Sequence, residues 1–263
     1  MNRVESSSVS SEYEENDRYE GVDPSSLLAG HDSDIASRYG SAIKEYDVAY
    51  QGIDYENNEV NRLSLKKISK WKSSESSKAG YAAESITVAK ENSENAVSGS
   101  KDRVKRSDDI KKQTDSNGNI VGGTNDTNFD VVSVTEDGVY ISNTGRQLKY
   151  RGQSADECTS IVLGKEMDRY FDVGAEMEIP EDYYDEVMEN IGQKIEYERK
   201  EYEECQKKGD KTGAETHKEK VERYKQREKG IRKGKLTSKE AYYAVQNPEL
   251  YTIASEAILS HKA

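Results

Sequence analysis

The fold is decided by residues 129–150, which read FDVVSVTEDGVYISNTGRQLKY. β-Branched and aromatic residues at 129–134 predict a strand, and the Thr135–Gly138 segment predicts a hairpin turn. A second strand at 139–142 and a third extended run at 146–150 follow. These segments form the only convincing sheet in the sequence. A short extended piece at 176–180, which Pro180 ends, is predicted to add an edge strand.

Helical patterns precede the sheet. Apolar residues spaced by three and four predict an amphipathic helix, and they are Ile35, Tyr39, Ala42, Tyr46, Ala49 and Ile53. A basic amphipathic helix is expected at 58–72, where cations alternate with Leu63, Leu65, Ile68 and Trp71. A further helix at 78–97 is expected to cover the sheet, because it carries alanines and Ile86 on one side and stops at Ser98-Gly99.

Helical patterns also follow the sheet. One helix is expected after Ser154, and heptad-like stripes on either side of Gly209–Gly213 predict an antiparallel helical hairpin over 181–231. Thr237 and Glu240 have the spacing of a capping box. A last apolar stripe comprises Leu250, Ile253, Ala254, Ala257 and Ile258. The chain stops inside this pattern, which suggests a fragment of a longer polypeptide.

The sequence therefore predicts an α+β fold, in which helices flank a small mixed β-sheet and a helical hairpin and C-terminal helices follow. Residues 1–77 are expected to be an acidic leader, largely disordered, with amphipathic helices near 34–53 and 58–72. Residues 78–180 are expected to form an α/β core. The hairpin and the C-terminal helices are assigned to residues 181–263.

The composition excludes several classes of protein. Hydrophobic residues make up 33% of the 263 residues, and no run of about 18 apolar residues exists to span a membrane. Cys158 and Cys205 are too few for a disulfide scaffold, and the three histidines lie too far apart for a zinc site. The N-terminal residues lack the apolar region of a signal peptide. We therefore expect a protein of the cytoplasm, or one delivered to a target cytoplasm.

The net charge of −12 is unevenly distributed. Residues 1–60 hold 4 basic and 14 acidic residues, whereas residues 61–152 hold 16 basic and 12 acidic residues. The last 111 residues, 153–263, hold 19 basic and 25 acidic residues. The excess of acidic residues therefore lies mainly in the N-terminal leader, and the segment with the predicted sheet is mildly basic. The net charge of the whole chain thus does not exclude a nucleic-acid substrate.

One constellation has the chemistry of a catalytic site. Asp130 opens the first strand, Gln147 and Lys149 lie on one face of the third, and Glu84 projects from the covering helix. Carboxylate and amide oxygens suit Mg²⁺, which lowers the pKa of a bound water. A nearby lysine can orient or deprotonate that water and offset phosphate charge. Asp, Gln and Lys are also ordinary surface residues of half-buried strands, so a purely structural role remains open.

Glu84, Asp130 and the Gln147-x-Lys149 pair resemble the core of PD-(D/E)XK, or restriction-endonuclease-like, nucleases. The resemblance covers about residues 78–180, with elements in the order helix, strands, helix, strand. It implies that Glu84, Asp130 and Gln147 bind Mg²⁺ and that Lys149 serves the attacking water. This sequence departs from the motif at two positions: Phe129 stands where proline is expected, and Gln147 replaces an acid.

The resemblance also implies a nucleic-acid substrate. Arg106, Arg146 and Arg151 are candidates for phosphate contacts, although they can equally be solubilising charges. The segments 105–109 and 125–130 look like those of bacterial proteins carried on mobile elements or acting as toxin-like effectors.

A non-enzymatic protein is the alternative reading. The hairpin at 181–231, the acidic leader and the helix at 35–53 all suit docking of a protein partner, delivery or assembly. The sequence thus leaves two hypotheses, a Mg²⁺-dependent nuclease-like enzyme and an interaction or structural protein.

Overall fold

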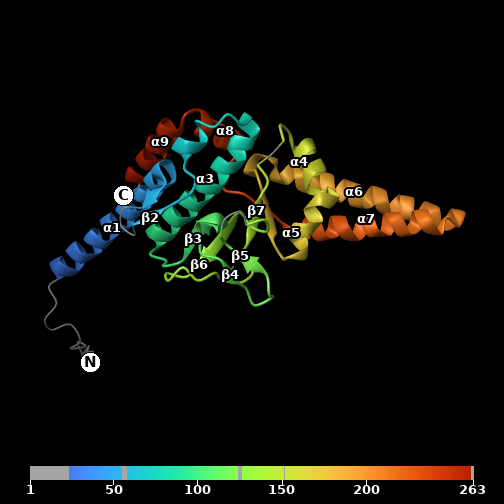
Figure 1. Cartoon of the computed structure of the whole chain (residues 1–263), viewed down its shortest axis with the longest axis horizontal. Coiled ribbons are helices and arrows are strands. Elements are labelled where there is room, and N and C mark those ends of the chain that lie inside the picture. Colours follow the sequence, from blue (N-terminus) through green and yellow to red (C-terminus); the bar gives the residue numbers. More distant parts are fainter. Residues whose placement is uncertain (1–23, 55–57, 124–125, 151, 262–263) are drawn as a thin grey trace, which may run out of the picture.

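A computed structural model describes residues 24–54, 58–123, 126–150 and 152–261. A five-stranded mixed sheet lies at the centre (Figure 1). Its strands, in spatial order, are β3 (Arg103–Arg106), β6 (Val131–Val134), β7 (Arg146–Leu148), β8 (Glu176–Ile179) and β9 (Ile231–Lys233). Strand β6 is antiparallel to both β3 and β7, whereas β8 is parallel to both β7 and β9. The α+β fold class is therefore confirmed.

Helices cover both faces of this sheet. One face packs on α3 (Glu75–Ser98), which in turn contacts α1 (Pro24–Gln51) and α8 (Ser238–Gln246). The short α2 (Leu65–Ile68) and α9 (Pro248–Ser260) complete this layer. The other face buries a core with α4 (Ala155–Val162), α5 (Asp168–Asp172) and α6 (Glu181–Lys208). Single-turn 3₁₀ helices lie at Ser107–Asp109 and Lys165–Met167.

Local chemistry explains the limits of α3. The Ser74 hydroxyl accepts a hydrogen bond from the Ser77 N–H, which caps the start of the helix. Gly99 ends it in the left-handed region at φ 72°, where a residue without Cβ is favoured. Small buried residues line its inner side, so α3 approaches the sheet closely; they are Ala79, Ala82, Ala83 and Ala89.

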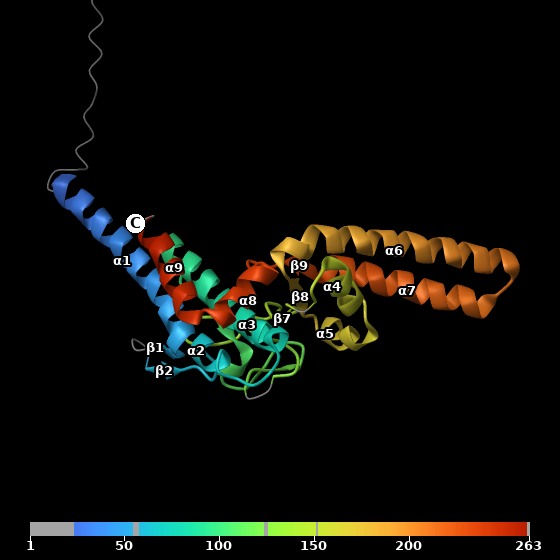
Figure 2. The same ribbon diagram turned by 90° about the horizontal axis from the view of Figure 1, so that it is seen from above.

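A helical hairpin of α6 and α7 (Lys211–Gly230) projects from the body, as Figure 2 shows. Gly209 closes α6 at φ 75°. Glu198 of α6 is buried between the helices, where it pairs with His217 at 2.5 Å and Lys220 at 3.1 Å. The predicted hairpin is thus present, and this buried acidic side chain pairs with residues of the facing helix.

Several predicted elements differ in the structure. The expected strand at 139–142 is reduced to a single bridge between Tyr140 and Val134. The expected helix at 58–72 is only the α2 turn, preceded by a two-stranded ribbon of β1 (Ile53–Asp54) and β2 (Glu59–Val60). A second ribbon pairs β4 (Gln113–Thr114) with β5 (Ile120–Val121). These differences arise because the conformation of a short segment depends on its tertiary contacts as well as on its local sequence pattern.

The prediction of an edge strand at 176–180 is wrong in position, because β8 lies inside the sheet between β7 and β9. Strand β9 follows the hairpin directly and has no alternating pattern of its own. It therefore joins residues 231–233 to strands of the expected 78–180 core. Likewise α1, within the expected leader, packs on α3; residues 1–23 lie outside the described residues. No helix in the described ranges is long and apolar enough to cross a membrane.

Met177 of β8 is fully buried in the core between the sheet and helices α4, α5 and α6. Its substitution therefore tests how much this core contributes to the stability of the protein. Met177→Ala is expected to lower the free energy of unfolding by about 2–5 kcal/mol, through lost burial and the cavity left behind. Ile120→Ala, at a half-exposed position on β5, is the control and is expected to change it by less than about 0.5 kcal/mol. Urea denaturation measures both, and equal losses would contradict this account.

Candidate functional site

The four predicted site residues lie around one end of strands β6 and β7. Strand alternation places Leu148 on the face toward α3 and Gln147 on the opposite face, level with Met177 of β8. Lys149 shares the face of Gln147, since its ammonium lies 4.5 Å from the centre of the Tyr170 ring on α5. Glu84 lies on α3, which covers the opposite face of the sheet, so the four residues do not share one face.

Asp130 lies between these groups, immediately before β6. One of its carboxylate oxygens accepts hydrogen bonds from the Leu148 N–H at 2.8 Å and from the Gln147 side-chain amide. The residue is half-buried. Burial raises the pKa of its carboxyl to about 6, although the positive charge of Lys149 acts in the opposite direction. Asp130 therefore interacts with both members of the Gln147-x-Lys149 pair.

Glu84 is 8% exposed and accepts a hydrogen bond from Nε of Arg106 at 2.9 Å. Burial, and after it the negative charge on Asp130, raise the pKa of Glu84 to about 8, although Arg106 acts in the opposite direction. The loss of hydration thus outweighs the ion pair.

Arg106 brings positive charge to the α3 side of the site. Besides Glu84, its guanidinium pairs with Asp109 at 3.1 Å and Asp108 at 3.6 Å, and its charge lowers the pKa of Asp130. Asp108 and Asp109 were not among the predicted site residues. The signal for them was the run at 105–109, in which two basic residues are followed by Ser107 and two acidic residues; which of these charges pair depends on the fold.

The donors fit a hard divalent cation in kind, because two carboxylates with raised pKa values gain from added positive charge. Two carboxylates alone, however, are too few ligands for such a cation. Within the described parts of the chain, no three His, Cys, Asp or Glu side chains are grouped as metal ligands. Gln147 would therefore have to supply a third oxygen, with its amide turned so that Oε1 replaces the nitrogen that now faces Asp130.

The arginines predicted to contact phosphates occupy interior positions. Arg146 is 3% exposed and pairs with Glu91 and with Glu178, at 2.5 and 2.8 Å. Arg106 is similarly buried, and Arg151 lies outside the described residues. Contact between Arg106 or Arg146 and a phosphate would require a buried ion pair to open, and neither is the surface charge that the sequence suggested.

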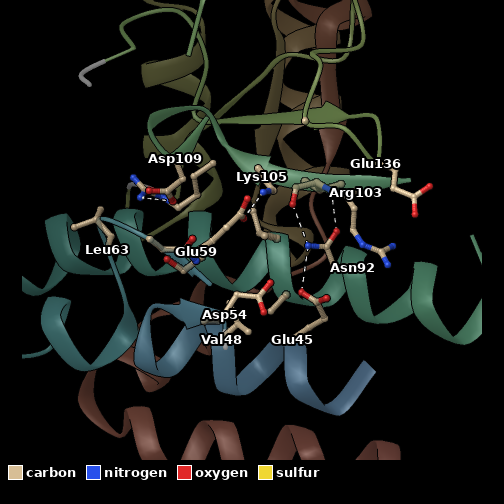
Figure 3. Close-up of a pocket in the computed structure, with 18 of the residues that line it drawn as sticks. Glu45, Val48, Asp54, Glu59, Leu63, Asn92, Arg103, Lys105, Asp109 and Glu136 are labelled. Carbon is tan, nitrogen blue, oxygen red and sulfur yellow. Dashed lines mark hydrogen bonds and ion pairs between the residues drawn. The ribbon is translucent and has the colours of Figure 1, made fainter. Parts of the chain in front are cut away.

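A hollow of about 460 Å³, which Arg106 helps to line, lies between α1, α3 and the outer edge of β3 (Figure 3). Asn92 of α3 covers that edge, because its amide accepts from the Val104 N–H at 2.8 Å and donates to the Val104 carbonyl at 3.0 Å. Lys105 pairs with Glu59 across the hollow. Arg106 and Asp109 line the hollow and also form the ion pairs beside Glu84, so these two residues belong to both features.

Comparisons of the chain with protein-family models, with curated proteins and with solved structures gave no match. The residues and their geometry are therefore the basis for assigning a function.

The buried carboxyl of Glu84 makes a prediction about pH. Its folded-state pKa of about 8 exceeds the ordinary 4.5, so the folded protein holds the extra proton between these values. Its contribution to stability is present below pH 4.5 and is lost as the pH rises toward 8. Glu84→Gln removes this dependence, so the stability of the variant relative to the wild type should rise as the pH increases from 4.5 to about 8.

Urea denaturation across this pH range tests the effect. Glu136→Gln is the control, because that carboxylate is largely exposed. Wild-type and Glu84→Gln stabilities that change in parallel with pH would show that Glu84 does not hold a proton in the folded protein.

Proposed function

We propose that this protein is a divalent-metal-dependent phosphodiesterase of the nuclease class, with its site at Glu84, Asp130, Gln147 and Lys149. The observation that carries the proposal is the position of Asp130. Its carboxylate bonds to Gln147, is attracted to Lys149 and raises the pKa of Glu84. Asp130 thus links the Gln147-x-Lys149 pair directly and acts on Glu84 through its charge, which supports the proposal.

The order of elements supports the proposal. Helix α3 is followed by the antiparallel strands β3, β6 and β7, then by α4, and then by β8 parallel to β7. This is the helix, strands, helix, strand order on which the resemblance to the PD-(D/E)XK core is based. The order concerns the scaffold only, and the proposed chemistry depends on the side chains.

Each side chain has a distinct task in this proposal. Glu84, Asp130 and the Gln147 amide oxygen would hold Mg²⁺, which supplies a bound water of lowered pKa and balances phosphate charge. Lys149 orients the attacking water or takes its proton, and Tyr170 limits the directions in which the amine can move. Leu148 N–H keeps the Asp130 carboxylate aimed at the strand end.

Substitution of Lys149 and Asp130 tests the proposal directly. Lys149→Met, which keeps most of the apolar stem but lacks the amine, is expected to lower Mg²⁺-dependent cleavage of DNA or RNA by about a hundredfold or more. Asp130→Asn is expected to abolish it, because the group that joins the site loses its charge. Cleavage is followed by gel electrophoresis of labelled single- and double-stranded substrates, with and without EDTA.

Lys208→Met is the matched control, because Lys208 is a largely exposed lysine at the far end of α6. Thermal unfolding of each variant separates loss of activity from loss of fold. Wild-type protein that cleaves none of the substrates with Mg²⁺ or Mn²⁺, or cleavage that survives Asp130→Asn, would refute the proposal.

A second candidate function, protein-partner docking, is favoured by the helical hairpin. It extends from the body, and Glu198 binds His217 and Lys220 across its seam, so the two helices present a defined surface (Figure 2). Tyr197 is a large, exposed side chain on that surface. If docking is the function, Tyr197→Asp is expected to weaken capture of a partner at least tenfold, while Asp130→Asn has no effect. Both are measured by quantitative affinity purification from host-cell extract.

A further inference from the structure

Four exposed lysines lie close together on α2 and on the turn that follows it. They are Lys66, Lys67, Lys70 and Lys72. The sequence has no acidic residue from 61 to 74. Lys66 donates to the Gln51 amide oxygen and Lys67 to a backbone carbonyl. Among the described residues, none of the four lysines forms an ion pair with a carboxylate, so their charge is not neutralised from within the chain.

Two nearby carboxylates reduce this positive charge only in part. Glu75, at the start of α3, pairs with Lys78 at 3.0 Å, so its own charge is already balanced. Glu249, at the start of α9, lines a hollow of about 340 Å³ together with Lys66 and Lys70. One unpaired carboxylate is therefore set against four lysines, and the local field remains positive.

Two aromatic rings lie beside the lysines. Trp71 stands between Lys70 and Lys72 in the chain, and its ring meets the Tyr81 ring of α3 in a T-shaped pair, with centroids 5.2 Å apart. Trp71 is half-buried, whereas Tyr81 is 41% exposed. The six side chains that we call the basic surface are Lys66, Lys67, Lys70, Trp71, Lys72 and Tyr81. Aromatic rings among cations are typical of surfaces that bind single-stranded nucleic acids, where bases stack on the rings.

The apolar side chains of this segment face the protein. Leu65 and Ile68 of α2 are 1% and 0% exposed, and Leu63 packs against the same core. A helix that binds a lipid bilayer must instead present such residues to the acyl chains. Helix α2 therefore offers a partner its cations and the adjacent rings, which suits a polyanion with planar groups better than a lipid surface.

The basic surface is connected to the proposed catalytic site. The Arg62 N–H donates to one carboxylate oxygen of Asp109 at 2.8 Å, and the other oxygen pairs with Arg106, the partner of Glu84. Tyr81 also lies on α3 three residues before Glu84, and residues at this spacing are neighbours on a helix. Helix α2 contacts both α1 and α3 (Figure 2). A strand bound at the basic surface would thus lie beside the helix that carries Glu84.

We propose that the basic surface binds single-stranded nucleic acid, with phosphates on the lysines and bases on the Trp71 and Tyr81 rings. A single strand fits better than a duplex, because the paired bases of a duplex stack on one another and leave no face for a protein ring. This inference rests on the proposed function, for which it names the substrate class. Binding can nevertheless be measured separately from cleavage.

The fluorescence of Trp71 tests the proposal at the surface itself, because this is the one tryptophan in the sequence. The full chain is titrated in EDTA with a single-stranded oligonucleotide of mixed sequence. The strand is expected to quench Trp71, with an affinity that falls as salt rises from about 50 to 200 mM. The double variant Lys70→Glu and Lys72→Glu is expected to raise the Kd about tenfold or more.

The double variant Lys207→Glu and Lys208→Glu is the matched control, because it makes the same charge change on exposed lysines at the far end of α6. Its Kd should equal that of the wild type. Tyr81→Ala is expected to weaken binding about fivefold or more, whereas Tyr197→Ala, at an exposed tyrosine of the hairpin, should not. Anisotropy of a labelled strand measures both, and circular dichroism checks that each variant is folded.

Four outcomes would overturn the proposal. They are a strand that does not quench Trp71, a duplex of the same sequence that binds as tightly, polyglutamate that binds as tightly, and equal Kd values for the two lysine variants. Tight polyglutamate binding would assign the surface to an acidic protein. Binding of phosphatidylserine vesicles in place of the strand, lost in Lys70→Glu with Lys72→Glu, would assign it to a lipid surface.

The two proposals fail in different ways. A wild type whose Trp71 is quenched by strands that it does not cleave with Mg²⁺ or Mn²⁺ would refute the proposed function and leave the binding surface standing. Cleavage of single strands that is unchanged by Lys70→Glu with Lys72→Glu would refute the binding surface and leave the proposed function standing.

Discussion

The structure depends on the buried ion pairs of Arg146. Its guanidinium donates hydrogen bonds to both carboxylate oxygens of Glu91 on α3 and to one carboxylate oxygen of Glu178 on β8. These bonds connect the covering helix to strands β7 and β8. This requires Arg146 to face α3. Because side chains alternate along a strand, Gln147 and Lys149 must then face the other way, toward Tyr170. A shift of one residue would leave Arg146 buried without its partners, at high cost.

The same buried pairs change the meaning of the charge pattern. Residues 61–152 are basic by composition, but inside the molecule Arg146 pairs with Glu91 and Glu178, and Arg106 pairs with Asp109. The excess of cations in this segment is therefore partly structural, and the field it presents to a nucleic acid is weaker than its count suggests. Around Glu84 the balance is different, because burial raises its pKa despite the adjacent guanidinium.

The apolar stripes of this chain have two different environments. Along α6 and α7 they face each other, and Ile191, Ile195 and Val221 are buried where the two helices meet. Along α9 the equivalent stripe faces outward, and aromatic and polar residues from the other side of that helix fill the contact with α1. Spacing alone describes both stripes equally well, because it identifies a helical face but not the surface that covers it.

Local signals in the sequence were enough to predict the periodicity of α1 and α3, the hairpin of α6 and α7, and the capping bond of Thr237. Residue type and alternation along a strand, which are also visible in the sequence, made Glu84, Asp130, Gln147 and Lys149 the candidate site residues. The pairing of β9 with β8, the burial of Arg106 and Arg146, and the exposure of α9 became apparent in the tertiary fold alone. These features depend on contacts between residues far apart in the chain, and their energies come from desolvation and packing, which no local pattern records.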